Sequence, residues 1–238
     1  RLFQAAGEAD FYIEYLYEIY RLVDPEYKGR ATVPVLWDKQ RQTIVSNESA
    51  EIVRMFNSEF AAITGDTPPP CPDLYPKPLR ADIDHWNEML YSSVNNGVYR
   101  AGFATTQEAY EEAVYALFAM LDKLEVHLAT HRYLTGTSLT EADLRLFPTL
   151  VRFDAVYFGH FKCNIRRISD YPNLWAYTRD IYQLPGVAET VDIAYNKAHY
   201  YGSHETVNPT LIIPVGPILD FMAPHQREQL TSLSGLPN

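Results

Sequence analysis

The residues most suggestive of chemistry lie around Val33-Pro34 and Glu48-Ser49. Proline has no backbone N–H and is excluded from a central strand, so Val33-Pro34 leaves a main-chain edge free, and we expect a cis peptide bond there. An exposed edge can pair with an extended peptide. Ser49 and the first N–H groups of the helix predicted over 51–56 attract a carboxylate. Together these features predict a site for a short acidic peptide.

Neither of the two cysteines is predicted to be a nucleophile. Cys71 follows three prolines within residues 67–73, with no strand before it and no helix N-terminus to activate its thiol. We interpret it as an incidental linker cysteine. Cys163 is expected to be a small packing residue, although its neighbour Lys162 leaves a reactive role open.

Histidine pairs do not give a convincing metal site. His127 and His131 lie four residues apart on one predicted helix, as two zinc ligands would, but no glutamate follows His127 and no third ligand is apparent. We interpret them as a surface pair and predict no metal. His199 and His204 lack ligand spacing, and either could instead contact a substrate.

Composition narrows the class of partner. The 238 residues are 47% hydrophobic, enough for a full core, and carry a net charge of −10, which argues against nucleic acid. No stretch approaches the roughly 18 apolar residues of a membrane-spanning helix, and the start resembles neither a signal peptide nor a transit sequence. We therefore predict a cytoplasmic protein whose partners are small molecules or proteins, not membranes.

The chain is predicted to divide at a proline-rich linker. Residues 1–66 alternate helix, strand, strand and helix, typical of a partial α/β domain. Its first helix carries apolar residues at helical spacing over 11–20 and stops at Asp24-Pro25. The linker spans 67–78, an all-helical domain spans 79–217, and 218–238 is expected to be a loosely structured tail.

Two helices of the second domain have clear signatures. The first is a helix of about six turns with one apolar core face, formed by Tyr110, Ala113, Leu117, Leu121, Leu124 and Leu128. The second begins with Thr140 as its N-cap and Asp143 as the returning carboxylate, with Leu139 and Leu144 as a hydrophobic staple. Pro148 should kink that helix or end its first segment.

Four blocks of the sequence resemble one protein family over roughly positions 10–217. They are TVPVLWDKQRQTIVSNESAEIVRMFN, NNGVYRAGFATTQEAY, RYLTGTSLTEADLRLFPTLVRFDAVYFGHFKCN and AHYYGSHETVNPT. In order and spacing they are similar to the glutathionyl-hydroquinone reductases, the omega-like Xi class of the glutathione transferases. The resemblance implies the glutathione transferase fold, a thioredoxin-like α/β domain joined to an all-helical domain, and it implies a homodimer.

Members of this class carry a nucleophilic cysteine in a Cys-Pro-Trp-Ala tetrapeptide at the start of their first helix. The 238 residues do not contain that tetrapeptide. We therefore expect an upstream segment to hold the cysteine, together with the first strand, first helix and second strand of the thioredoxin-like domain.

The resemblance also implies roles for particular residues. Val33 is the backbone partner of the cysteinyl group of glutathione, and Glu48 and Ser49 bind its γ-glutamyl ammonium and carboxylate. Arg30 either meets the glycine carboxylate or is solvated. Of the 18 tyrosines most should be packing residues, but Tyr99 and Tyr200 match positions where the class places tyrosines near its cysteine and aromatic substrate.

The implied reaction is reduction of glutathionyl-hydroquinones, with glutathione as cosubstrate. A thiolate takes the glutathionyl group as a mixed disulfide and releases hydroquinone, and a second glutathione then gives oxidised glutathione. Two other functions stay open. One is a catalytically silent binding module, favoured by the missing tetrapeptide, and the other is an omega- or glutaredoxin-like thioltransferase acting on disulfides.

Overall fold

The computed structural model describes residues 13–60 and 72–233, with side chains described to residue 230. The chain divides into two compact units, Arg1–Asp73 and Leu74–Asn238. The division falls inside the predicted linker 67–78. Cys71 lies outside the described residues.

The first unit follows the predicted order of helix, strand, strand and helix. Its elements are α1 (Leu16–Val23), β1 (Leu36–Asp38), β2 (Thr43–Ser46) and α2 (Ser49–Ser58). Helix α1 ends where predicted, with Asp24 as its C-cap. The two strands pair antiparallel, with Trp37 opposite Ile44. The Asp38 carboxylate shapes the turn between them by accepting the backbone N–H groups of Gln40 and Arg41, both at 2.9 Å.

The second unit is helical, as predicted. Its α-helices are α3 (Arg80–Leu90), α4 (Gly97–Gly102), α5 (Gln107–Leu128), α6 (Glu141–Arg152), α7 (Phe158–His160), α8 (Pro172–Tyr182), α9 (Ile193–Ser203) and α10 (Glu228–Leu233). Two π-helical segments occur at Tyr91–Asn95 and Phe153–Tyr157, and short 3-10 turns occur at Lys77–Leu79, Ile168–Asp170 and Ala188–Thr190. None of the helices in the described ranges is both long and apolar enough to cross a bilayer.

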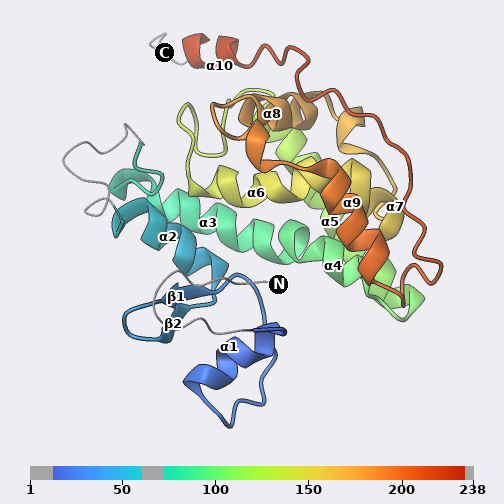
Figure 1. Ribbon diagram of the computed structural model, residues 1–238. Helices are drawn as coiled ribbons and strands as arrows, with labels where there is room; N and C mark the ends of the chain where they lie inside the picture. The colour runs from blue at the N-terminus through green and yellow to red at the C-terminus, as the bar shows by residue number, and fades with distance from the viewer. Residues whose placement is uncertain (1–12, 61–71, 234–238) are drawn as a thin grey trace. The chain divides into compact units, whose positions relative to one another are not determined.

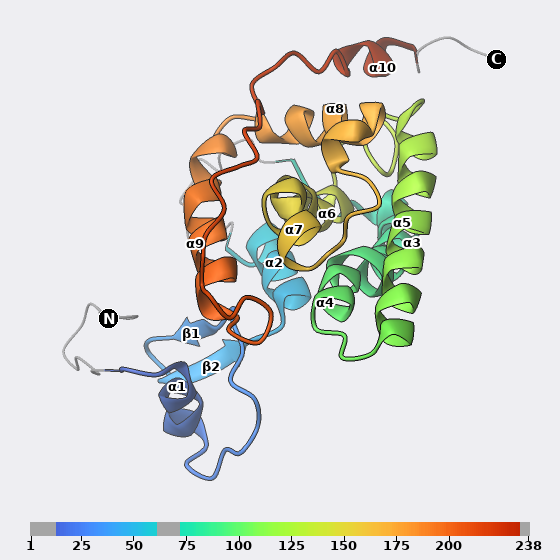
Figure 2. The same ribbon diagram turned by 90° about the vertical axis from the view of Figure 1, so that its right-hand side faces the viewer.

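The core of this unit forms around α6. Figure 2 shows α6 at the centre, with α5, α8 and α9 around it. The predicted apolar face of α5 is confirmed, because five of its six positions are buried and Tyr110 is half-buried, packed against the core. Helix α6 itself buries residues on most of its surface, including Leu146, Phe147 and Leu150.

The start of α6 confirms the predicted N-cap. Thr140 is the N-cap and Asp143 completes the capping box. The buried Asp143 carboxylate accepts the backbone N–H groups of Thr140 and Leu134, each at 2.8 Å, and the Tyr177 hydroxyl at 2.8 Å. Burial raises the pKa of this carboxyl, and the hydrogen bonds oppose that shift.

Helix α6 runs through Pro148 and ends at Arg152, so the proline does not end it. Proline removes one N–H from a helix and disturbs the preceding turn. Asn95, from the π-helical segment before α4, donates hydrogen bonds to the Arg145 carbonyl and to Thr149 Oγ1, both at 2.9 Å. This amide thus ties the start of α4 to the proline-containing turn of α6.

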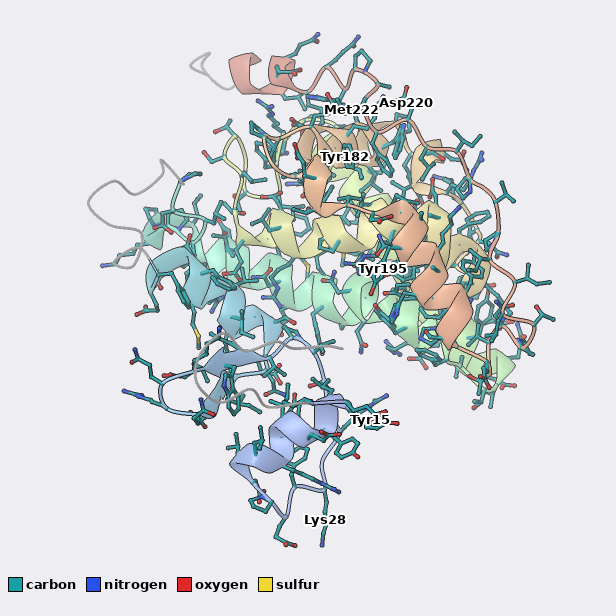
Figure 3. The ribbon with its side chains drawn as sticks, viewed as in Figure 1. Tyr15, Lys28, Tyr182, Tyr195, Asp220 and Met222 are labelled. Atoms are coloured by element: carbon teal, nitrogen blue, oxygen red, sulfur yellow. The ribbon has the colours of Figure 1, made fainter. Side chains whose placement is uncertain are left out.

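The segment after α9 returns along that helix toward α8 (Figures 1 and 2). Lys197 of α9 donates to the carbonyls of Pro214 and Val215 at 3.1 and 2.8 Å. Near α8, the rings of Tyr182 and Phe221 stack with centroids 4.8 Å apart. Figure 3 shows Tyr182 close to Asp220 and Met222 of this returning segment.

Arg227 attaches the end of the returning segment to the helical core. It is 3% exposed and donates to the carbonyls of Leu128, His131 and Arg132 at 3.1, 2.5 and 2.8 Å. These carbonyls lie at and beyond the C-terminus of α5, where no further helical N–H is available. The arginine therefore supplies donors to one buried and two part-buried carbonyls.

We predict that Arg227→Met lowers the free energy of unfolding by about 3 kcal/mol, because one buried and two part-buried carbonyls lose a charged donor. Urea denaturation followed by circular dichroism measures the change. Arg167→Met is the control, since that exposed guanidinium pairs with Asp170 on the surface and its loss should leave the free energy of unfolding nearly unchanged. Equal losses in the two variants would contradict this anchoring role.

Candidate functional site

Three tyrosine hydroxyls meet inside the helical unit. Tyr99 comes from α4, Tyr157 from the π-helical segment after α6, and Tyr200 from α9. The hydroxyls of Tyr99 and Tyr200 are 2.5 Å apart, and those of Tyr157 and Tyr200 are 3.1 Å apart. The structure thus brings together the two tyrosines singled out by the resemblance, and it adds a third.

The tyrosine rings also pack against one another. The Tyr157 and Tyr200 rings meet edge to face, with centroids 5.5 Å apart at 88°, and Tyr99 meets Tyr157 at 5.9 Å and 61°. Such edge contacts are a favourable geometry for aromatic pairs. Tyr157 and Tyr200 are buried, whereas Tyr99 is partly exposed. Tyr99 is therefore the member of this group that solvent or a ligand can reach most readily.

Tyr99 and Tyr157 are held in the neutral form by a raised pKa. Burial, together with the hydrogen bond to Tyr200, raises the pKa of Tyr99 to about 12. Burial raises the pKa of Tyr157 well above its usual range. Arg152, at the end of α6, is their nearby cation. Burial lowers its pKa, but the oxygens of Tyr157, Tyr200 and Tyr99 outweigh that effect and give a net rise. At neutral pH the cluster therefore offers hydroxyl hydrogens.

Three further rings lie next to this cluster and form what we call the aromatic wall: Phe103, Phe161 and His204. The Phe103 ring lies 5.2 Å from the rings of both Phe161 and His204, and it is 46% exposed. Phe161 packs so closely on Gly102 that a Cβ there would overlap its ring. The exposed Phe103 ring and the partly exposed Tyr99 hydroxyl, backed by the buried rings, are chemically suited to a flat aromatic ligand that carries hydroxyl groups.

Two histidines adjoin the wall. His160 Nε2 and His204 Nδ1 are 3.0 Å apart, and His160 is 4% exposed. Burial and the neighbouring His204 lower the pKa of His160 to about 4, so this imidazole is neutral at physiological pH. Burial lowers the pKa of His204 too, with a further contribution from His199. Over the described residues, no three His, Cys, Asp or Glu side chains are arranged to hold a metal ion.

Packing and hydrogen bonding account for the other candidates from the sequence, Cys163, His127 and His131. Cys163 is fully buried, and burial raises the pKa of its thiol to about 12, which fits a packing residue. The His127 and His131 rings stack at 4.3 Å, and His127 Nε2 lies 3.0 Å from the Leu134 carbonyl oxygen. That imidazole is thus engaged with the loop after α5.

The first unit presents the edge predicted at Val33. The Val33–Pro34 peptide bond is cis, as expected, and Val33 is 75% exposed. The residue before it is held by Tyr20, whose hydroxyl donates to the Thr32 carbonyl at 2.6 Å. Asn47 Nδ2 donates to Thr32 Oγ1 at 3.1 Å, which links this edge to the turn before α2.

Glu48 and Ser49 occupy the start of α2. Glu48 is the N-cap and Ser49 is the first helical residue, and both are exposed. Ser46 supports this turn, because its Oγ accepts the Glu48 N–H at 3.1 Å and donates to Glu51 at 2.8 Å. Arg30 is exposed, with its backbone carbonyl accepting the Tyr27 hydroxyl at 2.9 Å. Val33, Glu48 and Ser49 thus leave polar backbone and side-chain groups accessible.

Comparison with known proteins matches this arrangement to one family. The family model described as "Glutathione S-transferase, C-terminal domain" matches residues 107–180. Glutathionyl-hydroquinone reductase YqjG of Escherichia coli is 56% identical over 224 residues, which cover 94% of this chain and 67% of YqjG. Glutathionyl-hydroquinone reductase PcpF of Sphingobium chlorophenolicum is also 56% identical, over 86% of this chain and 64% of PcpF.

The chain belongs to the glutathionyl-hydroquinone reductases, the Xi class of the glutathione transferases.

Solved structures agree with this membership of the Xi class. The glutathione-bound structure of YqjG superposes with a TM-score of 0.87, covering 94% of this chain and 72% of that one. A Xi-class transferase from Natrialba magadii, 49% identical, also gives 0.87, over 91% of this chain and 65% of that one. The chain spans about two thirds of the length of the relatives it matches.

Sequence reasoning did not single out Tyr157, Arg152 and His160, which the structure places around the pair of Tyr99 and Tyr200. All three lie inside one of the blocks that carry the resemblance, within residues 132–164. Their types are those of ordinary core or helix-surface residues, and their partners lie far away in sequence: Tyr200 is 43 residues from Tyr157 and His204 is 44 from His160. The one sequence signal for them was the unusual density of aromatic residues around 153–161.

The lowered pKa of His160 predicts a pH-dependent stability for this transferase. In the unfolded chain, the His160 imidazole is protonated below its ordinary pKa of 6.5. In the folded protein it stays neutral until the pH falls to about 4. The free energy of unfolding should therefore fall as pH drops from 6.5 toward 4, and it should not change further from this cause below 4.

Urea denaturation at intervals between pH 7 and 4 tests this dependence. His160→Gln should make the loss of stability across that range shallower than in the wild type. A His160→Gln slope equal to the wild-type slope would contradict the assignment.

Proposed function

We propose that this protein reduces glutathionyl-hydroquinones to hydroquinones, with glutathione as cosubstrate. The observation that carries the proposal is the hydrogen-bonded pair of Tyr99 and Tyr200 beside an aromatic wall, in a chain 56% identical to two glutathionyl-hydroquinone reductases. Neutral phenols next to aromatic rings provide the contacts that a hydroquinone requires.

The proposed reaction has two steps. A cysteine thiolate attacks the sulfur of the glutathionyl-hydroquinone. The carbon–sulfur bond breaks, the aryl carbon gains a proton, and a mixed disulfide between the cysteine and glutathione remains. The thiolate of a second glutathione then attacks this disulfide, which gives oxidised glutathione and frees the cysteine.

Tyr99 and Tyr200 serve the first of these steps. The phenolic oxygens of the substrate change their hydrogen bonding as the ring carbon is protonated, so a hydroxyl donor placed beside them stabilises the transition state. A tyrosine that stays protonated at neutral pH fills this role. The raised pKa of Tyr99, caused mainly by burial, supports it.

In the first unit, Val33, Glu48 and Ser49 are the residues that we propose bind glutathione. The exposed backbone at Val33 pairs with the cysteinyl group, and the start of α2 receives the γ-glutamyl end. Arg30 is exposed and available to the glycine carboxylate. The glutathione-bound structure of YqjG, a homologue with 56% identity, supports glutathione as a ligand.

The homodimer and the cytoplasmic location stay predictions from the sequence and the family. Two other activities define the possible outcomes of the test. A thioltransferase would act on simple disulfides faster than on glutathionylated quinols, and a silent module would bind without turnover.

The polypeptide that carries this chain, including any residues that precede Arg1, should release hydroquinone from a glutathionyl-hydroquinone and form one oxidised glutathione per turnover. Chromatography of both products measures this. Tyr99→Phe should lower kcat by about 100-fold, because the donor to the substrate oxygen is lost. Tyr115→Phe, at an exposed position on α5, should leave kcat unchanged.

A faster rate on a simple disulfide than on the quinol would replace this proposal with thioltransferase activity. Turnover of neither, with ligand binding intact, would replace it with a binding module. Full activity of both Tyr99→Phe and Tyr200→Phe would remove the proposed roles of the two phenols.

We predict that Ser49→Ala weakens glutathione binding roughly tenfold, because a hydroxyl donor to a carboxylate is removed. Isothermal titration calorimetry with glutathione measures the affinity. Ser58→Ala, at the opposite end of α2, is the matched control, since its hydroxyl donates to the Arg54 carbonyl within the helix. If the two substitutions weaken binding equally, the start of α2 is not the γ-glutamyl site.

A further inference from the structure

His204 is the polar member of the aromatic wall. Its ring meets the Phe103 ring edge to face, with centroids 5.2 Å apart at 74°, and it stacks on Phe161 at 5.9 Å and 16°. It also meets the Tyr200 ring edge to face, at 5.7 Å and 86°. His204 is the C-cap of α9, four residues after Tyr200, and both rings contact Phe161. The end of α9 therefore brings an imidazole to the same place as the phenol cluster.

One nitrogen of the His204 ring is held by the core, and the other is accessible. His160 Nε2 and His204 Nδ1 are 3.0 Å apart, and His160 is 4% exposed. His204 Nε2 forms no hydrogen bond with any residue that the structure describes. In that part of the chain, the buried side-chain atoms without a partner are Asn87 Oδ1 and Arg227 Nε. Because His204 Nε2 is not among them, a ligand can reach it.

This nitrogen can bind a hydroxyl group in either tautomer of the imidazole. Burial lowers the pKa of His204, which favours the neutral ring at physiological pH. A neutral imidazole has one donor and one acceptor nitrogen. If Nδ1 accepts a hydrogen bond from His160, Nε2 carries the hydrogen and donates, and if Nδ1 donates, Nε2 accepts. A phenolic hydroxyl both donates and accepts, so it can pair with Nε2 in both cases.

Phe103 contacts both His204 and Tyr99. The Phe103 ring is 46% exposed, and it stacks with the Tyr99 ring at 6.5 Å and 22°. A flat ring that packs on Phe103 therefore has a phenol hydroxyl from one neighbour and an imidazole nitrogen from the other. A 1,4-hydroquinone has hydroxyl groups at the two ends of its ring. An apolar ring with two polar neighbours is suited to such a ligand.

We propose that His204 binds the hydroxyl group of the substrate that lies away from the carbon–sulfur bond, and that His160 is the positioning residue that holds the His204 ring. The inference rests on the proposed function, and Tyr99 then serves the hydroxyl group beside the carbon–sulfur bond. The hydrogen bonding of that nearer hydroxyl changes when the adjacent ring carbon is protonated. The farther hydroxyl takes no part in bond breaking, so its contact with His204 determines which rings are preferred.

Nitrogen-15 NMR of the active polypeptide, labelled in its histidine rings, tests the contact without turnover. Adding hydroquinone should shift the Nε2 signal of His204, which is assigned by its loss in His204→Phe. Anisole has an aromatic ring but no hydroxyl hydrogen and should shift this signal less. The Nε2 signal of His127, which lies 3.0 Å from the Leu134 carbonyl oxygen, should not move. A His204 signal that stays unchanged up to the solubility limit of hydroquinone, or that moves equally with both ligands, would overturn the proposal.

Turnover of two glutathionylated rings tests the specificity. One substrate is a glutathionyl-hydroquinone, and the other is the glutathionyl-phenol that keeps only the hydroxyl group beside the sulfur. His204→Phe should lower the ratio of kcat/KM for the hydroquinone to kcat/KM for the phenol about tenfold, because only the hydroquinone loses a hydrogen bond. His85→Phe, at an exposed position on α3, should keep the wild-type ratio.

Two substitutions of His160 test its positioning role by the same ratio. His160→Leu should lower the ratio nearly as much as His204→Phe, because the His204 ring loses the partner that holds it. His160→Gln keeps a side-chain amide that can hydrogen-bond to His204 Nδ1, and it should restore the ratio toward the wild-type value. Equal ratios in the two variants would overturn the positioning role.

The outcomes separate the inference from the proposed function. If His204→Phe lowers kcat/KM equally for both rings, His204 is only structural, which overturns the inference while the reductase activity stands. Absence of quinol turnover in the wild type would overturn the proposed function, and the NMR titration would still decide whether His204 binds a hydroxylated ring.

Discussion

A buried carboxylate at the start of α6 fixes the position of the helix that leads to the tyrosine cluster. Asp143 is fully buried and accepts the N–H groups of Leu134 and Thr140 and the Tyr177 hydroxyl. A buried charge is tolerated only when it is fully hydrogen-bonded, and removing its partners typically costs several kcal/mol. Because a helix advances by a constant rise and rotation, fixing its first turn also fixes Arg152 at its last turn. Tyr157 lies one π-helical segment later. The tyrosine cluster therefore depends on a cap about 20 Å away along the helix and the segment after it.

The sequence predicted the elements whose signals are local. The order of α1, β1, β2 and α2, the apolar face of α5 and the N-cap at Thr140 all rest on residues within a few positions of one another. The resemblance led to Tyr99 and Tyr200, whose meeting the structure shows. Tyr157 could not be found in this way, because it lies in a π-helical segment where the 3.6-residue period no longer tells which face a side chain occupies. Arg227 carries no local signal either, since the carbonyls it binds lie about a hundred residues earlier in the chain.

Four of the buried tyrosines of the helical unit fall into two groups by the partner of the hydroxyl. Tyr171 and Tyr177 donate to the carboxylates of Asp122 and Asp143, so their hydrogens are committed to the fold. The hydroxyls of Tyr157 and Tyr200 instead meet other phenols. A hydroxyl hydrogen donated to a carboxylate is no longer available to a ligand. A phenol that accepts a hydrogen bond, in contrast, still has a hydrogen of its own to donate. Pairing tyrosine with tyrosine thus satisfies buried polar groups without committing the phenol hydrogens to carboxylates, which suits a site for a hydroxylated ring.

The two π-helical segments make this protein unusually sensitive to changes in chain length. Each segment accommodates an extra residue within a helical run, and each stands directly before or around a cluster tyrosine: Tyr91–Asn95 precedes the helix of Tyr99, and Phe153–Tyr157 contains Tyr157. Removing one residue from either segment would restore a regular helix and rotate the next helix by roughly 100° about its axis. Single-residue insertions and deletions between 91 and 99 or between 152 and 157 should therefore be rejected wherever the phenol cluster is retained.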